Sequence, residues 1–385
     1  MKRPKTNQKP KSSIRSIAFA LLSLTAFVIF LNRSDVAIEY MKKGLGLCGA
    51  AVIPSLFPFM VISELVIQSP AIYNICKIFR RPMKRLFNVS EAGGCAFILG
   101  VLCGFPIGAK TAISAYDSGR ISKDELSRLL CFCNNPGSAF VISVVGISLF
   151  GSKRIGVIMY ACVIFSSVAV GILSKFLSSK KQCAESEASF LPPTDIDTIG
   201  IFTSAVSKSA LSMLTVCAYV VFFSSLVGCI GDILSSTSAP NMLSTLIFGF
   251  FEISSGVQAA AGTKNIEAAI ILAAAFVAWS GISVHCQIIT ICAGRGLSFR
   301  PYFVSKVSQS IICAFFMGLA LKHFFADAPP ISEDVFMGGE DVISVANSLF
   351  YCFSFFFASV FGVGIGIKPN KHKAFQGDDK KVEKI

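Results

Sequence analysis

Residues 93–110 read GGCAFILGVLCGFPIGAK, and this stretch decides how the rest of the chain is interpreted. The run is apolar up to Ala109, yet it is shorter than the ~20 residues that a membrane-spanning helix needs. Gly104, Pro106 and Gly108 interrupt any helix that forms there. A short, broken apolar segment in a membrane protein indicates a re-entrant hairpin, whose non-helical backbone must be buried in protein or line a cavity. We therefore expect Gly104 to Ala109 to form a wall of a substrate site.

The composition is that of an integral membrane protein. The chain has 385 residues, 53% of them hydrophobic, and its net charge of +13 comes from Lys and Arg gathered in particular loops and tails. In a membrane protein such clusters indicate orientation, so no nucleic-acid partner is expected. The cysteines stand mostly alone in apolar runs without a zinc-binding spacing, which predicts no disulfide bond and no metal site.

The hydrophobic pattern predicts an all-α membrane protein with about eight transmembrane helices and two re-entrant hairpins. The first expected span, 14–31, also has the length of a signal peptide, but no small-residue cleavage site follows it. The other spans are expected at about 44–65, 129–150, 156–176, 201–230, 266–292, 302–325 and 342–367, with hairpins at 93–118 and 243–262.

Polar stretches divide the chain into six parts. They are a basic N-terminus with the first span (1–34), a first repeat (35–177), a cytoplasmic linker (178–200), a second repeat (201–326), an acidic outer loop with the last span (327–367), and a basic cytoplasmic tail (368–385). The strongly basic loops and both tails then lie inside, as the positive-inside rule requires; the loop 32–43 and the turn 151–156 are exceptions.

The two repeats show the same order of interruptions. Residues 98–100 (ILG) match residues 247–249 (IFG), each a few residues before a break in a hairpin, and a second break follows about thirty residues later. Because each repeat has an odd number of full crossings, the repeats must be inverted in the membrane, as in many secondary transporters. One such match arises easily by chance, whereas four breaks in the same order do not.

These breaks predict a substrate site where helix N-termini meet near the middle of the membrane. Pro106 and Pro136 suit the first helical position, and Asn135, Ser255 and Ser280 suit N-caps. Free N–H groups at helix starts favour an anionic or carboxylate-bearing substrate. The alternative is that glycine and proline only allow close helix packing. The expected substrate-binding residues are Gly104, Phe105, Pro106, Gly108, Ala109, Asn134, Asn135, Gly137, Ser254, Ser255, Gly256, Ser280, Gly281, Ser283 and Gln287.

Two ionisable residues lie at the breaks of the second repeat. Glu252 stands in an apolar stretch, where a carboxylate must be protonated, paired or bound to a cation, so it is a candidate site for a coupling proton or Na⁺. A structural carboxyl bonded to the backbone fits the sequence equally well. His285 is a second candidate for proton coupling, although a lone histidine more often has a structural role. No nucleotide-binding loop or catalytic triad is evident, so neither an enzyme nor a cofactor is expected.

Four motifs in this order resemble the YlbJ (SpoVV) family of sporulation integral membrane proteins: GFPIGAK (104–110), CNNPG (133–137), EISSG (252–256) and SGISVHCQ (280–287). The resemblance covers about residues 40–325. The wider group carries the nucleoside-recognition, or Gate, domain and is similar in plan to concentrative nucleoside transporters. Cys133 and Cys286, although inside these motifs, are left out of the expected site.

The resemblance implies a secondary transporter in the outer forespore membrane of a Gram-positive spore former. For this family it further implies the movement of dipicolinic acid, a small aromatic dianion, toward the spore. The Gate domain instead suggests nucleosides as substrates. A rival of another class is a non-transporting membrane scaffold for spore-envelope assembly. The lipid bilayer is the other expected partner.

Overall fold

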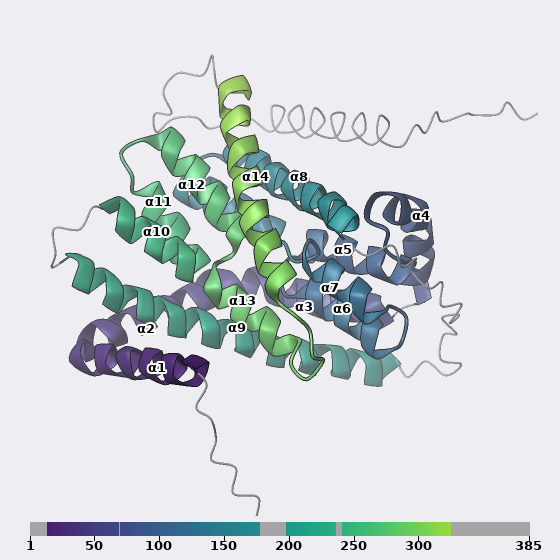
Figure 1. Ribbon diagram of the computed structural model, residues 1–385, viewed down its shortest axis with the longest axis horizontal. Helices are drawn as coiled ribbons and strands as arrows, with labels where there is room; N and C mark the ends of the chain where they lie inside the picture. The colour runs from purple at the N-terminus through teal and green to yellow at the C-terminus, as the bar shows by residue number, and fades with distance from the viewer. Residues whose placement is uncertain (1–13, 69, 178–197, 236–240, 325–385) are drawn as a thin grey trace, which may run out of the picture. The chain divides into compact units, whose positions relative to one another are not determined.

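The computed structural model describes residues 14–68, 70–177, 198–235 and 241–324, which belong to one compact unit of the chain (Figure 1). Every regular element in these ranges is helical. The expected eighth span, most of the linker and both ends of the chain lie outside the described residues.

The helices of the two halves follow one another with short connections. The first half contains α1 (Ile14–Asn32), α2 (Ser34–Leu47), the π-helical turn η1 (Cys48–Val52), α3 (Ile53–Gln68), α4 (Pro70–Phe87), α5 (Glu91–Cys103), α6 (Ile107–Asp117), α7 (Lys123–Leu130), the π-helical segment η2 (Phe140–Leu149) and α8 (Lys153–Leu177). The second half contains α9 (Thr198–Ser235), α10 (Asn241–Phe251), α11 (Ile253–Ala261), α12 (Ile266–Trp279), α13 (Gly281–Ile291) and α14 (Arg300–Phe324).

Four stretches of the described chain are long and apolar enough to cross a membrane. They are Lys153–Phe176, Ile199–Ser235, the interrupted Ile266–Ile291 and Arg300–His323. Two bent helix pairs raise the number to six if each pair is one span; they bend by 97° between α1 and α2 and by 92° between α4 and α5. The chain is therefore a polytopic α-helical membrane protein, while the full set of eight spans stays a prediction.

Two segments expected to be loops are helical. Residues 32–43 fall mostly in α2, where Glu39 and Lys43 form an i,i+4 ion pair of 2.6 Å. The basic stretch 68–92, which lies between the second expected span and the first hairpin, is mostly α4. This helix buries Met83 and Leu86 while its arginines stay exposed. The reason is amphipathic spacing: a helix with one apolar and one basic face is stable against the rest of the protein or at a membrane surface, although its mean composition is that of a loop.

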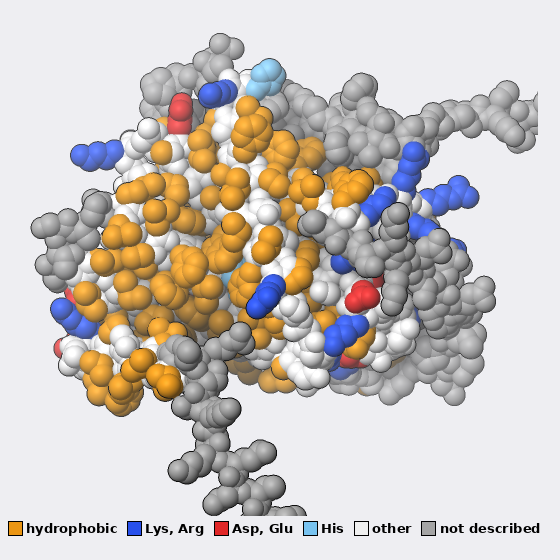
Figure 2. Space-filling view, in the orientation of Figure 1, with side chains coloured by type: hydrophobic (Ala, Val, Ile, Leu, Met, Phe, Trp, Pro, Cys, Tyr) orange, Lys and Arg blue, Asp and Glu red, His pale blue; other side chains and the backbone are white. Residues whose placement is uncertain are grey.

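The outward faces of the long helices are apolar. Leu211 of α9 is 69% exposed and Ile311 of α14 is 65% exposed. Orange side chains cover most of the described face in Figure 2, and charged side chains lie mainly toward its margins. An exposed apolar surface of this extent suits lipid rather than water as the surrounding solvent.

The packing of the helices places the breaks inside the protein. Helix α9 lies along α2 and α3, α14 packs on α8 and α12, and the helices of each pair α5–α6 and α10–α11 pack on each other. The two prolines of α3, Pro54 and Pro58, do not end the helix; the chain widens into the π-turn η1 directly before Pro54. Cys95 on α5 is disulfide-bonded, so the expectation of no disulfide is wrong at that position.

Candidate functional site

The first break separates α5 from α6 and makes room for another part of the backbone. Gly104 ends α5 with a φ of 80°, a left-handed value that favours glycine. A Cβ atom placed on Gly100 or on Gly108 would lie 1.9 or 2.0 Å from the carbonyl oxygen of Cys133. These glycines are therefore required because the second broken segment crosses directly over the first hairpin.

That second broken segment, residues 131–137 between α7 and η2, is held by the side chains of its own asparagines. Asn134 accepts a hydrogen bond from the amide of Ala109 (3.0 Å) and donates to the carbonyl of Leu130 (3.3 Å). Asn135 donates to the carbonyl of Phe132 (2.9 Å) and to Ser167 Oγ of α8 (3.1 Å). Both asparagines are buried, so the side chains replace the backbone bonds that the missing helix would have made.

Two polar residues of α14 complete this network. Lys306 donates to the carbonyl oxygen of Asn134 and to Gln309 Oε1 (2.9 Å), and Gln309 Nε2 donates to Asn135 Oδ1 (2.9 Å). Lys306 is 1% exposed and Gln309 is fully buried. Sequence analysis missed both residues, although a lysine within an expected span (302–325) was a usable signal.

The third break is a single residue, Glu252, between α10 and α11. Glu252 has an extended backbone and caps α11, since its Oε2 accepts from the amide of Ser255 (2.7 Å). Its Oε1 is buried and has no hydrogen-bond partner among the described residues. The hairpin is close-packed like the first one, because a Cβ on Gly256 would lie 2.2 Å from the Cα of Gly249.

The fourth break separates α12 from α13 at Ser280. Ser280 and Gly281 have φ values of 77° and 78°, so a serine holds a left-handed conformation here. A Cβ on Gly281 would lie 3.1 Å from the amide nitrogen of Ile253 and 3.2 Å from the Cα of Glu252. The third and fourth breaks therefore touch each other, as the first and second do.

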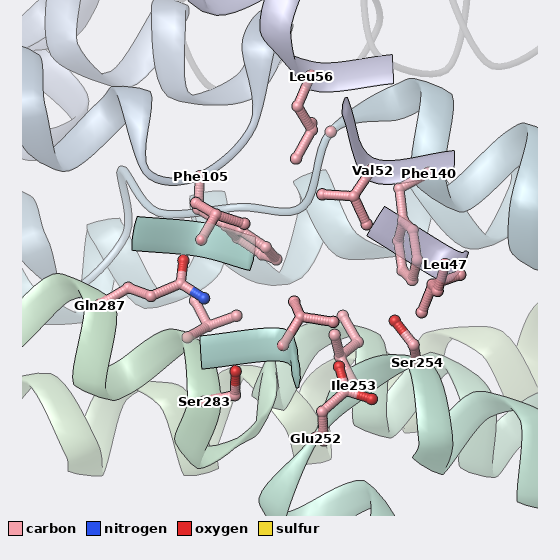
Figure 3. Close-up of a pocket in the computed structure, with 14 residues that line it drawn as sticks. Leu47, Val52, Leu56, Phe105, Phe140, Glu252, Ile253, Ser254, Ser283 and Gln287 are labelled. Atoms are coloured by element: carbon pink, nitrogen blue, oxygen red, sulfur yellow. The ribbon is translucent and has the colours of Figure 1, made fainter. Parts of the chain in front are cut away.

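Residues of the first three breaks line one pocket together with side chains of α13, the helix that begins at the fourth break (Figure 3). It leaves about 50 Å³ for the centres of water molecules, which is enough for a few of them. In Figure 3, Glu252 and Ser283 present their oxygen atoms from one side, and the apolar side chains of Leu56, Val52 and Phe140 lie opposite. The lining residues are Leu47, Val52, Leu56, Phe105, Gly137, Phe140, Val216, Val220, Glu252, Ile253, Ser254, Ser283, Val284 and Gln287.

Two buried oxygen atoms on lining residues of this pocket lack partners. Glu252 Oε1 and Gln287 Oε1 make no hydrogen bond among the described residues, although Glu252 is fully buried and Gln287 is 2% exposed. Unpaired buried polar atoms are unusual, and each one needs an explanation. A ligand with hydrogen-bond donors would satisfy both oxygens, and a proton or a cation would satisfy the carboxylate of Glu252.

The helix starts differ from those expected. The N-cap of α11 is Glu252 rather than Ser255, and Ser280 makes no capping bond to α13. Asn135 caps no helix, and neither Pro106 nor Pro136 occupies the first position of a helix. The amides that the anion argument needs are partly taken already, because the side chains of Asn134 and Glu252 accept from the starts of α6 and α11. Long-range capping explains the error, since local rules consider only residues near each helix start.

His285 lies in an aromatic cage behind the break. Its Nδ1 is 2.8 Å from the hydroxyl of Tyr302, and its ring lies edge-on to Trp279 and Phe303 at 4.4 and 5.2 Å between centroids. The residue is fully buried and does not line the pocket. This setting favours the structural alternative for His285, and its role in proton coupling stays a prediction.

Comparison with known proteins finds a similar membrane protein. YlbJ of Bacillus subtilis (strain 168), named a sporulation integral membrane protein, is 26% identical over 340 residues, which cover 80% of this chain and 83% of that protein. This similarity supports the resemblance to the YlbJ family seen in the four motifs. Neither a protein-family profile nor a solved structure matches it. The apolar helices indicate an integral membrane protein, and the protein to which the chain is similar is a sporulation protein of that class.

Six of the expected site residues line the pocket: Phe105, Gly137, Glu252, Ser254, Ser283 and Gln287. The others do not line it: Gly104, Pro106, Gly108, Ala109, Asn134, Asn135, Ser255, Gly256, Ser280, Gly281 and His285. Several of these shape the crossing backbones instead. The apolar lining from η1, α3, η2 and α9 was missed, because an apolar residue that faces a pocket looks the same in sequence as one that faces lipid or core.

Among the described residues, no three His, Cys, Asp or Glu side chains come together as a group that could hold a metal ion. The polar atoms at the pocket are instead a single carboxylate, a carboxamide and two hydroxyls. Such a set suits a proton, a monovalent cation or an organic ligand with hydrogen-bond donors.

Proposed function

We propose that this protein is a secondary transporter that binds a small metabolite in the pocket at the four breaks. The observation that carries the proposal is one pocket lined by three interruptions and by α13, the helix that begins at the fourth. Its buried carboxylate, Glu252, has an oxygen without a hydrogen-bond partner among the described residues. Interrupted helices that meet inside a membrane protein are the usual construction of substrate sites in secondary transporters. The proposal assigns transport, not catalysis, and places both chain ends in the cytoplasm and the protein in the outer forespore membrane.

Dipicolinic acid is the first candidate substrate, because the family resemblance implies it. The aromatic rings of Phe105 and Phe140 offer apolar surface to a flat pyridine ring. A dianion beside the carboxylate of Glu252 would be repelled unless that carboxylate were protonated or bound to a cation. The proposal therefore includes coupling: a proton or Na⁺ occupies Glu252 when the anion enters.

A nucleoside is the second candidate, and the unpartnered acceptors favour it. Glu252 Oε1 and Gln287 Oε1 would accept from the N–H and O–H groups of a base or ribose, which a dianion lacks. The two substrates predict opposite effects of neutralising Glu252 on binding. An anion should bind better to the neutral residue, whereas a nucleoside should bind less well because it loses a hydrogen-bond acceptor.

The test uses purified full-length protein in proteoliposomes, with uptake of labelled dipicolinate and uridine measured under imposed proton or sodium gradients. We expect gradient-driven dipicolinate uptake that Glu252→Gln uncouples from the gradient. Uridine uptake without dipicolinate uptake would support the second candidate. Glu267→Gln, an exposed glutamate in the first turn of α12, is the matched control and should leave uptake unchanged.

Variants that keep the fold distinguish the transporter hypothesis from the scaffold hypothesis. Gly104→Leu and Asn135→Leu are poor choices, because both residues hold the backbone of the first half. Gln287→Leu removes an unpartnered oxygen and keeps the volume similar. A transporter with this change should insert normally in a spore former and fail to support accumulation of its substrate, whereas a scaffold should be unaffected.

A further inference from the structure

Lys306 on α14 is a buried ammonium group that has no acidic partner in the described part of the chain. It is 1% exposed, and none of the ion pairs among the described residues includes it. A lysine inside a membrane protein is expensive unless its charge is matched, so such residues usually mark a functional element. The transport proposal does not use Lys306, because this residue does not line the pocket.

The atoms that hold this ammonium are neutral oxygens at an unwound segment. One is the main-chain carbonyl of Asn134, within residues 134–137, which form no helix, and the other is Gln309 Oε1, at 2.9 Å. Carbonyl oxygens of unwound segments are the ligands with which membrane transporters coordinate Na⁺. The surroundings of the Lys306 nitrogen are thus those of a monovalent cation and not those of a salt bridge.

The segment needs a donor or a cation at this point. The carbonyl of Cys133 is directed into the gap between Gly100 and Gly108, and the carbonyls of Leu130 and Phe132 accept from the asparagine side chains. The carbonyl of Asn134 receives the Lys306 ammonium. Without this group, a buried carbonyl and the oxygen of Gln309 would both lose their partner, which is unfavourable in a water-free interior.

We infer that the Lys306 ammonium is a tethered cation, which permanently fills a monovalent-cation site formed by the broken segment of the first half and α14. The native protein consequently requires no free ion at this position. Truncation of the lysine should open the site to small cations such as Na⁺ or methylammonium. The inference does not depend on which substrate is transported, and the experiment measures thermal stability instead of uptake.

The experiment compares Lys306→Ala with the native protein, purified in detergent with Na⁺, K⁺, methylammonium or choline as the only monovalent cation at equal ionic strength. In choline, whose bulk excludes it from the vacated space, we expect Lys306→Ala to melt lower by about 5 °C or more. Na⁺ or methylammonium should restore much of that loss with a saturable concentration dependence. The native protein should melt at one temperature in all four salts.

Two further variants make the outcome decisive. Lys306→Met fills the space without a charge, so it should be destabilised and show no rescue by any cation. Lys322→Ala removes an exposed lysine from the last turn of the same helix and should behave as the native protein does. Native-like stability of Lys306→Met, equal melting of Lys306→Ala in all four salts, or its failure to fold in any of them would each overturn the inference. Folding of Lys306→Ala in Na⁺ or methylammonium alone would support it.

Discussion

The broken segments of the two halves hold corresponding places in the chain order but differ in how their polar atoms are satisfied. In the first half, the segment around Asn134 is tied by hydrogen bonds to α6, α8 and α14, and every buried side-chain atom of its two asparagines has a partner. In the second half, Glu252 and Gln287 each have an oxygen on the pocket that finds no partner in the described part of the chain. Within the described residues, the polar side chains of the first segment are thus fully hydrogen-bonded, whereas the second half retains two free acceptors.

This difference indicates that the two halves have different roles, one rigid and one responsive to a ligand. A fully bonded break resists change, because any movement would leave buried groups unsatisfied. An incompletely bonded break gains most from binding a proton, cation or substrate, so ligand binding should act mainly through α11 and α13. The same order of elements in both halves fits the predicted repeat, while the inversion of the repeats in the membrane stays a prediction.

The close approach of the backbones should be the most sensitive feature of both halves. Gly108→Ala places a Cβ about 2.0 Å from the carbonyl oxygen of Cys133. Because backbone atoms cannot yield as a flexible side chain does, we expect a loss of about 3 kcal/mol or more in the free energy of unfolding. Thermal melting in detergent measures the loss, and Gly256→Ala should show a similar one in the second hairpin.

Gly46→Ala in α2 is the control for these changes, since nothing lies within 4 Å of the added atom. Alanine is the better helix former by about 1 kcal/mol, so Gly46→Ala should melt at the native temperature or above it. Native-like melting of Gly108→Ala would show that the second broken segment does not cross the first hairpin as described.

The comparison of the two breaks is tested directly by matched leucine substitutions. Asn135→Leu leaves Gln309 Nε2 and Ser167 Oγ without this partner and should cost about 1–3 kcal/mol of stability. Gln287→Leu removes an oxygen that has no partner, so stability should stay the same or rise while ligand binding falls. Melting curves with and without dipicolinate or uridine measure both quantities. Equal destabilisation by the two changes would remove the distinction between the breaks.

A smaller effect is expected where the halves meet outside the membrane-spanning helices. Arg295, after α13, binds Asp117 at the end of α6 through two contacts of 2.5 and 2.9 Å. The hydrogen bond from Arg295 lowers the pKa of Asp117 below its ordinary value. The pair therefore stabilises the protein above the unfolded aspartate pKa of about 4, and this contribution disappears as the pH falls through the lower folded pKa.

Because Asp117 is 49% exposed, solvent screens the pair, and Asp117→Asn should lower stability by at most about 1 kcal/mol at neutral pH. The difference from the native protein should shrink at high salt and vanish in acid. A pH-independent difference would mean that the asparagine disturbs the end of α6 for another reason.

The sequence was most informative about where helices are interrupted. Glycine, proline, asparagine and serine within apolar runs indicated the regions of the breaks at Gly104, Asn134–Gly137, Glu252 and Ser280, because these residues disfavour helix locally. The helix start at Glu252 was expected three residues later, at Ser255. What satisfies each break was not predictable in the same way. Asn134 caps a helix that begins far from it in sequence, and the Lys306–Gln309 pair reaches the first half from α14. Such partners depend on the tertiary arrangement, which local patterns do not contain.

The smallest effect concerns backbone conformation, and it also separates the two halves. At the first break a glycine, Gly104, adopts the positive φ, whereas Ser280 does so at the fourth break. A left-handed conformation costs a non-glycine residue about 1–2 kcal/mol, and glycine would remove this strain from the folded state. Glycine also has more conformational freedom in the unfolded chain, which cancels about half of that gain. Ser280→Gly should therefore raise stability by roughly 0.5 kcal/mol. Ser280→Ala keeps the strain and loses only hydrogen bonds of 3.4 and 3.5 Å, so it should bring no gain. A gain from glycine that is accompanied by weaker ligand binding would indicate that the strain at Ser280 helps to hold the second half ready for its ligand.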